Sequence, residues 1–175
     1  MKEDALFIIT TKMEKEDYRK FLYTATFRRN PAVLWILAGI SLLGTIFLQF
    51  SVGQIRILPL LLKWCLLMVI AVVVICFQVE RKNKTRIRTD KTGTFEQETV
   101  LYFYPQHLKT EVPAVKGTHT LEYHQFFQVL ESKDYFMFYY SKNLASLLRK
   151  KDMEELDSFR EFLKEKFGAR YRILR

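Results

Sequence analysis

Two long apolar segments, separated by only six residues, constrain this chain more than any other feature. Residues 31–50 contain no charged side chain, and residues 57–78 contain only Lys63. Twenty residues of helix rise about 30 Å, which is the thickness of the hydrocarbon core of a bilayer. A helix of this length in a soluble protein would show a polar stripe, and the first segment has none. The sequence therefore predicts a transmembrane hairpin with spans at 31–50 and 57–78.

Basic side chains flank this hairpin unevenly. Residues 80–91 contain six Lys or Arg and residues 19–29 contain four, whereas the short link between the spans offers only Arg56. Cytoplasmic segments of membrane proteins carry the excess of Lys and Arg. We therefore expect a multi-pass protein of the cell membrane with both the N- and the C-terminus in the cytoplasm.

The ends of the spans supply the residues predicted to meet the membrane interface. Lys63 lies about one turn inside the second span, from where its long side chain can return the ammonium to the interface. The alternative is an intramembrane ion contact, although neither span offers an acidic partner. The other basic residues anchor the topology and attract anionic headgroups by about 1 kcal/mol each. The membrane-interface candidates are Arg28, Arg29, Lys63, Trp64, Arg81, Lys82, Lys84, Arg86 and Arg88.

Small residues in the first span suggest where helices could approach closely. Ser41 and Thr45 lie one turn apart, and Gly39 and Gly44 are nearby. Small side chains let transmembrane helices pack closely. The pattern is weak, so packing within the hairpin and association into a homo-oligomer both remain open.

The remaining sequence divides into three parts. Residues 1–30 predict a strand over 5–12 and a helix over 15–28, and residues 79–91 form a basic juxtamembrane linker. Residues 92–175 show short apolar runs with turn residues every eight to twelve positions, as expected of an antiparallel meander. A lone terminal strand would leave its backbone groups unpaired, so we expect the strand in residues 1–12 to join this sheet.

Two segments define the core expected in residues 92–175. Residues 135–140, YFMFYY, form an aggregation-prone run that should lie centrally in the sheet. An amphipathic helix follows, with Asp152 and Glu155 as its predicted capping box and Gly168 at its end. Its apolar stripe should close one side of the sheet. That stripe consists of Met153, Leu156, Phe159, Phe162, Leu163 and Phe167.

Charge and motif content argue against several functions. Residues 92–175 carry thirteen basic and twelve acidic side chains, so this part lacks the basic face of a nucleic-acid binder. His107, His119 and His124 stand without the cysteine or carboxylate spacing of a metal site. No nucleophile elbow and no phosphate-binding glycine loop occurs. The sequence therefore predicts no enzyme activity, no metal and no cofactor.

Three stretches resemble the YcxB-like family of bacterial membrane proteins: Glu16–Asn30, Tyr123–Asp152 and Asp157–Phe167. The resemblance implies a two-helix membrane hairpin followed by a pleckstrin-homology-like (PH-like) domain. Relatives are expected to carry a Trp and an acidic residue where this chain has His124, Gln125 and Phe126. The resemblance implies a bacterial cell membrane and no established activity.

These observations predict an integral membrane α-helical hairpin plus an α+β cytoplasmic domain. That domain would be an antiparallel PH-like sheet or barrel, closed by one C-terminal amphipathic helix. Such a protein would be a non-enzymatic interaction or regulatory protein that docks a protein partner or the anionic inner leaflet of the lipid bilayer. A transport- or channel-associated subunit and a membrane self-protection protein are the alternatives, and both rest on analogy.

Overall fold

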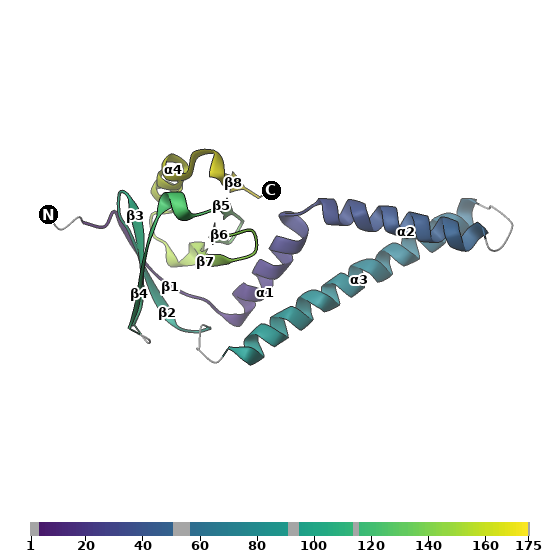
Figure 1. Cartoon of the computed structure of the whole chain (residues 1–175), viewed down its shortest axis with the longest axis horizontal. Coiled ribbons are helices and arrows are strands. Elements are labelled where there is room, and N and C mark those ends of the chain that lie inside the picture. The colour runs from purple at the N-terminus through teal and green to yellow at the C-terminus, as the bar shows by residue number, and fades with distance from the viewer. Residues whose placement is uncertain (1–3, 51–56, 91–94, 114–115, 175) are drawn as a thin grey trace. The chain divides into compact units, whose positions relative to one another are not determined.

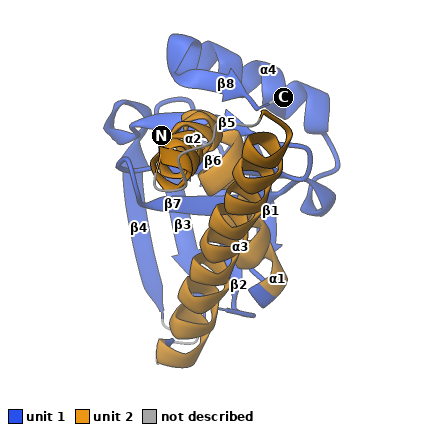
Figure 2. Cartoon of the chain, turned by 90° about the vertical axis from the view of Figure 1, so that its right-hand side faces the viewer, with its two compact units in different colours: residues 1–15, 90–175 blue, residues 16–89 orange. Residues whose placement is uncertain are grey.

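A computed structural model describes residues 4–50, 57–90, 95–113 and 116–174. The chain divides into two compact units (Figures 1 and 2). Unit 1 comprises residues 1–15 and 90–175, and unit 2 comprises residues 16–89. Unit 2 is therefore an insertion in the sequence of unit 1, between its first strand and the rest of its sheet.

Unit 2 is all helical. Helix α1 (Lys15–Tyr23) continues into a π-helical turn, η1 (Thr24–Arg28), and is followed by α2 (Ala32–Phe50) and α3 (Ile57–Thr89). Helix α3 continues without a break through most of the predicted basic linker, because residues 79–89 hold no Pro or Gly to end it. The two predicted spans are thus α2 and the first two thirds of α3.

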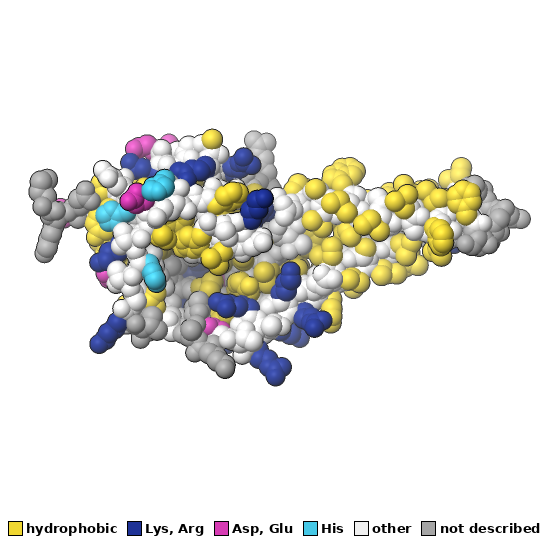
Figure 3. All heavy atoms as spheres, viewed as in Figure 1, with side chains coloured by type: hydrophobic (Ala, Val, Ile, Leu, Met, Phe, Trp, Pro, Cys, Tyr) yellow, Lys and Arg dark blue, Asp and Glu magenta, His cyan; other side chains and the backbone are white. Residues whose placement is uncertain are grey.

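The surface of the hairpin is apolar (Figure 3). Trp35, for example, is 80% exposed, and large aliphatic side chains are exposed along both α2 and α3. Each of these helices is long and apolar enough to cross a membrane.

Small and polar side chains lie where α2 packs along α3. Ser41, Thr45 and Gln49 are buried at successive turns of α2, and Gly44 would place a Cβ 3.8 Å from Leu67 of α3. The predicted small-residue face is thus a packing face within the hairpin. Gly39 does not belong to it, because a Cβ there would meet nothing within 4 Å.

The first sheet of unit 1 has the order β1-β2-β3-β4, and all its pairs are antiparallel. The N-terminal strand pairs with β2 from Phe7 opposite Phe103 to Lys12 opposite Glu98, which confirms that it joins the sheet. The strands are β1 (Phe7–Lys12), β2 (Glu98–Phe103), β3 (His107–Val112) and β4 (Gly117–Glu122).

The second sheet has the order β7-β6-β5-β8. Its strands are β5 (Gln128–Glu131), β6 (Tyr135–Tyr139), β7 (Ala145–Arg149) and β8 (Tyr171–Ile173). Every residue of β6 is buried, which confirms the predicted central position of the aromatic run. Strand β8 was not predicted, and it pairs parallel to β5, so the second sheet is mixed rather than wholly antiparallel.

Of the predicted sheet or barrel, the barrel is wrong, because the two sheets do not close on each other. Strands β1 and β7 are edge strands of separate sheets, and no described strand pair joins the two sheets. Side chains bridge the seam in place of a backbone ladder: Thr11 donates to Asp152 at 2.6 Å, and Arg149 bonds Glu14 at 2.6 Å.

Helix α4 (Leu156–Phe167) lies against the core of unit 1 (Figure 1). The predicted apolar stripe is confirmed, since four of its residues are buried: Phe159, Phe162, Leu163 and Phe167. The predicted capping box is wrong. Asp152 lies in the 3₁₀ turn η4 (Lys150–Asp152), where Thr11 and Arg149 occupy its carboxylate, and Glu155 caps without a side-chain bond. Gly168 ends the helix as predicted, with a positive φ of 49°.

Aromatic rings fill the space between the sheets and α4. Phe159 is fully buried and meets Phe7, Phe103 and Phe136 edge-to-face, with ring centroids 4.8–5.4 Å apart. Such pairs add about 0.5–1.5 kcal/mol each beyond the area they bury. This cluster fixes α4 relative to β1, and so shapes the surface between them.

Candidate functional site

A groove of about 590 Å³ runs along one face of α3 in unit 2. Its α3 residues recur at spacings of three and four, which places them on a single helical face. Tyr18 of α1 forms the other wall. The lining residues are Tyr18, Gln78, Arg81, Lys82, Thr85, Arg86 and Thr89.

An ion pair holds α1 beside this face of α3. Arg19 donates to Glu80 at 2.7 Å, and the Tyr23 hydroxyl donates to the same carboxylate oxygen at 2.9 Å. The hydrogen bond from Arg19, followed by that from Tyr23, lowers the pKa of Glu80. Glu80 therefore stays ionised at neutral pH, and α1 keeps Tyr18 at the groove.

Three of the predicted membrane-interface residues, Arg81, Lys82 and Arg86, converge on the groove. Lys84 and Arg88 lie on the same helix and are exposed, but do not line it. Arg28 and Arg29 stand at the end of η1, just before α2. The basic run in the sequence pointed to the basic residues of the groove. Their helical spacing, which the prediction did not use, would also have shown which of them share one face of α3.

The other two candidates, Lys63 and Trp64, make contacts inside the hairpin. The Lys63 ammonium donates to Gln49 Oε1 at 2.9 Å, and the Trp64 indole donates to the carbonyl of Ala38 at 3.1 Å. Both contacts join α2 to α3. The amide gives Lys63 a neutral structural partner, so its presence in an apolar helix requires no ion pathway.

The groove has the chemistry of an anion site. Arg81, Lys82 and Arg86 are exposed, and no carboxylate pairs with them among the described residues. Arginine and lysine bind phosphate through charge-assisted hydrogen bonds, and the hydroxyl of Thr85 offers a neutral donor beside them. The Thr89 hydroxyl instead donates to the carbonyl of Thr85 at 2.8 Å. The arrangement suits a phosphate group carried on a larger molecule that can also contact Tyr18.

A second polar cluster, in unit 1, was missed in the sequence. Glu131 of β5 is 3% exposed and accepts bonds from Lys150 at 2.5 Å, from Arg160 at 3.0 Å and from the Tyr171 hydroxyl. Burial alone would raise the pKa of Glu131, but these bonds outweigh it and lower the pKa to about 2. The cluster ties β5, η4, α4 and β8 together and leaves its carboxylate no room for a substrate.

No group of three metal-ligating side chains occurs among the described residues. The three histidines also stay apart in their contacts: His107 stacks on Tyr104, and His124 faces Glu122 at 3.0 Å. His119 lies on β4 opposite Thr110.

The described residues define a class of protein: a long apolar helical hairpin inserted into an α+β unit of two small sheets and one helix. Residues 103–163 match the model of the family described as YcxB-like protein, which confirms the predicted resemblance over about a third of the chain. The match covers the core of unit 1 from β2 to α4 and excludes the hairpin and its groove. No curated protein and no solved structure matches the chain.

Proposed function

We propose that this chain is a non-enzymatic, membrane-anchored interaction protein of the bacterial cell membrane whose basic groove binds an anionic lipid headgroup. The observation that carries the proposal is the groove on α3, where Arg81, Lys82 and Arg86 meet Tyr18 at the end of a helix long enough to span a bilayer. The hairpin anchors the chain, and the groove docks it on the inner leaflet.

The position of the groove along α3 supports a headgroup as its ligand. Gln78 ends the apolar part of the helix, and the other α3 lining residues occupy the next three turns. At 1.5 Å per residue, Arg81 to Arg86 lie about 5–12 Å beyond Gln78. The headgroup layer extends about 5–8 Å beyond the hydrocarbon core on each side, so Arg81 and Lys82 lie within it and Arg86 lies at its aqueous surface. The excess of Lys and Arg on this side of the hairpin supports a cytoplasmic location for both termini.

The architecture of unit 1 supports a PH-like interaction module. A four-stranded antiparallel sheet faces a second sheet containing three consecutive antiparallel strands, and one C-terminal helix packs on the core between them. In this arrangement α2 and α3 replace the loop between the first and second strands. A module of this kind, held at the membrane by the groove, would present its outer surface to a protein partner.

Native mass spectrometry of the full chain tests the proposal. The protein would be released from mixed micelles containing phosphatidylglycerol and phosphatidylcholine, and the lipids that stay bound would be counted. We expect one tightly retained phosphatidylglycerol. Replacing Arg81 and Arg86 with Gln should remove it, because each basic residue near a headgroup contributes about 1 kcal/mol.

A matched control lies on the same helix. The double variant Lys84→Gln/Arg88→Gln removes the same number of charges from exposed positions that do not line the groove. It should keep the bound phosphatidylglycerol. Equal loss of phosphatidylglycerol from both variants would show that only net charge attracts lipid. If the wild type retained phosphatidylcholine as tightly as phosphatidylglycerol, the groove would not select an anionic headgroup and the proposal would be wrong.

A further inference from the structure

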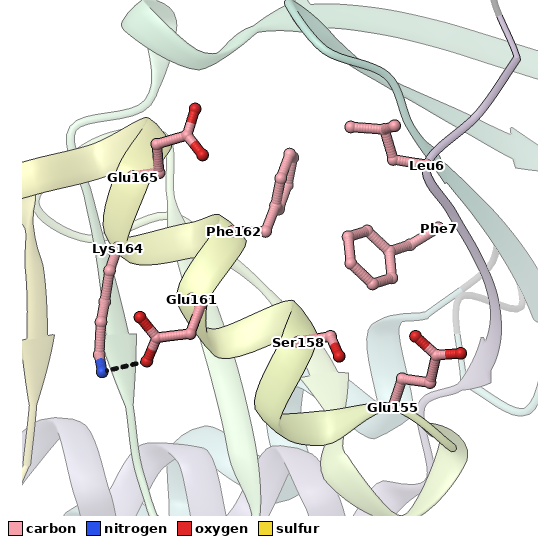
Figure 4. A pocket seen from close by; sticks show the side chains of 8 residues that line it. All are labelled: Leu6, Phe7, Glu155, Ser158, Glu161, Phe162, Lys164 and Glu165. Atoms are coloured by element: carbon pink, nitrogen blue, oxygen red, sulfur yellow. Dashed lines mark hydrogen bonds and ion pairs between the residues drawn. The ribbon is translucent and has the colours of Figure 1, made fainter.

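A second groove follows the seam where the two sheets of unit 1 fail to close. It consists of two adjoining hollows of about 730 and 330 Å³ that share Leu6, Phe7 and Glu155. Figure 4 shows the larger hollow, with Leu6 and Phe7 on one side and α4 on the other. We call both hollows together the seam groove. Its described walls are residues 6–9 and 152–155 and one face of α4.

One wall of the seam groove is a strand with an unused edge. Strand β1 pairs with β2 on one side, and no described strand pairs with it on the other. An unpaired strand edge presents backbone donors and acceptors that can bind another extended chain. Elsewhere along β1 the seam is bridged by Thr11 and Asp152, so the open part is the stretch beside Leu6 to Ile9.

Two parts of the groove are apolar: its floor, formed by Phe7, Phe162 and Met153, and the side formed by Leu6 and Ile8. Phe7 contacts Phe162 with ring centroids 5.3 Å apart, and Met153 packs on the same core. Leu6 and Ile8 are 53% and 63% exposed, and alternate with the inward-facing Phe7 and Ile9. A chain laid beside β1 would therefore cover apolar surface as well as satisfy backbone groups.

The charged side chains of the groove are almost all acidic. Lys164 is the single basic residue among the described residues that line it, and it is paired with Glu161 at 2.7 Å. Glu154 and Glu155 are exposed and have no ionic partner among the described residues. This is the opposite of the chain as a whole, whose net charge is +9. The acidic residues of the groove are Asp152, Glu154, Glu155, Glu161 and Glu165. Asp152, Glu161 and Glu165 are paired with Arg149, Lys164 and Lys166, so Glu154 and Glu155 supply the unpaired negative charge among the described residues of the groove.

From these features we infer that the seam groove binds an extended, basic segment of a protein partner, which adds as a strand to the free edge of β1. Backbone hydrogen bonds to residues 6–9 give binding, and alternating apolar side chains fill the floor. Four paired residues extend about 13 Å. Lys or Arg side chains of the segment reach Glu154 and Glu155, and these two carboxylates select a basic occupant.

The charge of the groove argues against its other occupants. An anionic lipid surface would be repelled by the carboxylates that a basic peptide attracts. A second copy of the chain joined through β1 would place two acidic rims together, with the same unfavourable effect. The inference rests on unit 1 alone and does not depend on the basic groove of unit 2.

Fluorescence anisotropy with the full chain in nanodiscs of zwitterionic lipid tests the inference. The probe is a labelled, end-capped hexapeptide of alternating Lys and Val. Its matched control is the same peptide N-methylated at every residue, which cannot donate a strand hydrogen bond. We expect binding of the first peptide and at least a tenfold weaker binding of the second, with slower amide exchange at residues 6–9 in the first complex only.

Two variants test the location of the site. Glu154→Gln/Glu155→Gln should weaken peptide binding about fivefold, since each exposed ion pair contributes a fraction of a kcal/mol to about 1 kcal/mol. Asp134→Asn, at an exposed acidic residue in the turn between β5 and β6, should leave binding unchanged. Equal binding of the N-methylated peptide, an equal effect of Asp134→Asn, or no peptide binding would overturn the inference.

Discussion

Units 1 and 2 distribute their side chains in opposite ways. Unit 1 buries aromatic rings such as Phe159 and carries most of its charged groups outside. Unit 2 exposes large apolar side chains over α2 and α3, and buries Ser41, Thr45 and Gln49 between them. Apolar burial stabilises a fold in proportion to the area removed from water, and only unit 1 obtains its stability in that way.

This difference is the one expected if the hairpin lies in lipid, as proposed above, and unit 1 lies in water. Between helices surrounded by lipid, stability comes from close packing of small residues and from hydrogen bonds, because lipid tails are as apolar as leucine. The grooves follow the same division: the basic groove lies on the helix that leaves the apolar hairpin, and the acidic seam groove lies on unit 1. Substitutions matched between the units can test how far this contrast extends.

Truncating a buried ring should give the largest effect. Phe159→Ala in unit 1 removes a side chain that is 0% exposed, and should lower the free energy of unfolding by about 4 kcal/mol. Phe77→Ala in α3 removes the same atoms from a side chain that is 68% exposed, and should change stability by less than about 0.5 kcal/mol in micelles. Hydrogen exchange of peptides from β5 and β6 reports unit 1. Similar losses in both units would contradict the contrast.

Removing the buried carboxylate of unit 1 should give the next largest effect. Glu131→Gln leaves Lys150 without its anionic partner and Arg160 with only the exposed Asp157, and should lower the stability of unit 1 by about 3 kcal/mol. The change should be visible as faster exchange of amides in β5 and β8. Asp157→Asn, which removes only the exposed partner of Arg160, should cost less than about 1 kcal/mol.

The same carboxylate predicts an acid transition. The folded-state pKa of Glu131 lies at about 2, below its value of about 4.5 in the unfolded chain, so its ionised form stabilises the fold. That stabilisation is fully present above about pH 4.5 and is lost as the pH falls towards 2. Unit 1 of the wild type should therefore lose stability over this range, and Glu131→Gln should lose much less. Parallel acid profiles for the two proteins would show that other carboxylates dominate.

The sequence predicted the elements of both units well, because their signals are local. Residues 31–50 form a long uncharged and mainly apolar run, residues 135–140 form an aromatic run, and Gly168 marks a helix end with a positive φ. Strand β8 was missed because a strand of three residues, two of them with exposed side chains, gives no periodic pattern. It forms because β5 offers an open edge, which is a property of the assembled sheet.

The candidate sites were predicted only in part, for a related reason. The predicted interface residues included only three of the six α3 residues that line the basic groove, and the contribution of Tyr18 depends on the contact between Glu80 and α1. The capping role predicted for Asp152 failed because Thr11 lies 141 positions away in the sequence yet binds its carboxylate. Long-range side-chain pairs of this kind leave no trace in spacing. The gap between the two sheets, and with it the seam groove, likewise depends on contacts between residues far apart in the sequence.

Adding bulk to the hairpin interface should have a smaller effect than the losses in unit 1. Thr45 is 0% exposed where α2 packs on α3, so Thr45→Leu should lower hairpin stability by about 2 kcal/mol through overpacking. Ile40→Phe adds bulk to an exposed position of the same helix and should be tolerated. The two tryptophans, Trp35 and Trp64, both lie in unit 2, so their fluorescence during denaturation in SDS follows the hairpin alone. If Thr45→Leu and Ile40→Phe lowered hairpin stability equally, Ile40 would not face lipid.

The smallest expected effect concerns Lys63 and Gln49, the one pair that brings a charge into the apolar helices. Hydrogen bonds between transmembrane helices contribute about 0.6 kcal/mol on average and at most about 1.7 kcal/mol. In a double-mutant cycle with Lys63→Met and Gln49→Leu, we therefore expect a coupling energy of about 1 kcal/mol, again from tryptophan fluorescence in SDS. The cycle isolates the bond at 2.9 Å from the separate cost of placing an ammonium near lipid. A coupling energy near zero would mean that the ammonium extends to the membrane surface, so that Lys63 acts as an interface anchor and Gln49 stabilises the hairpin without it.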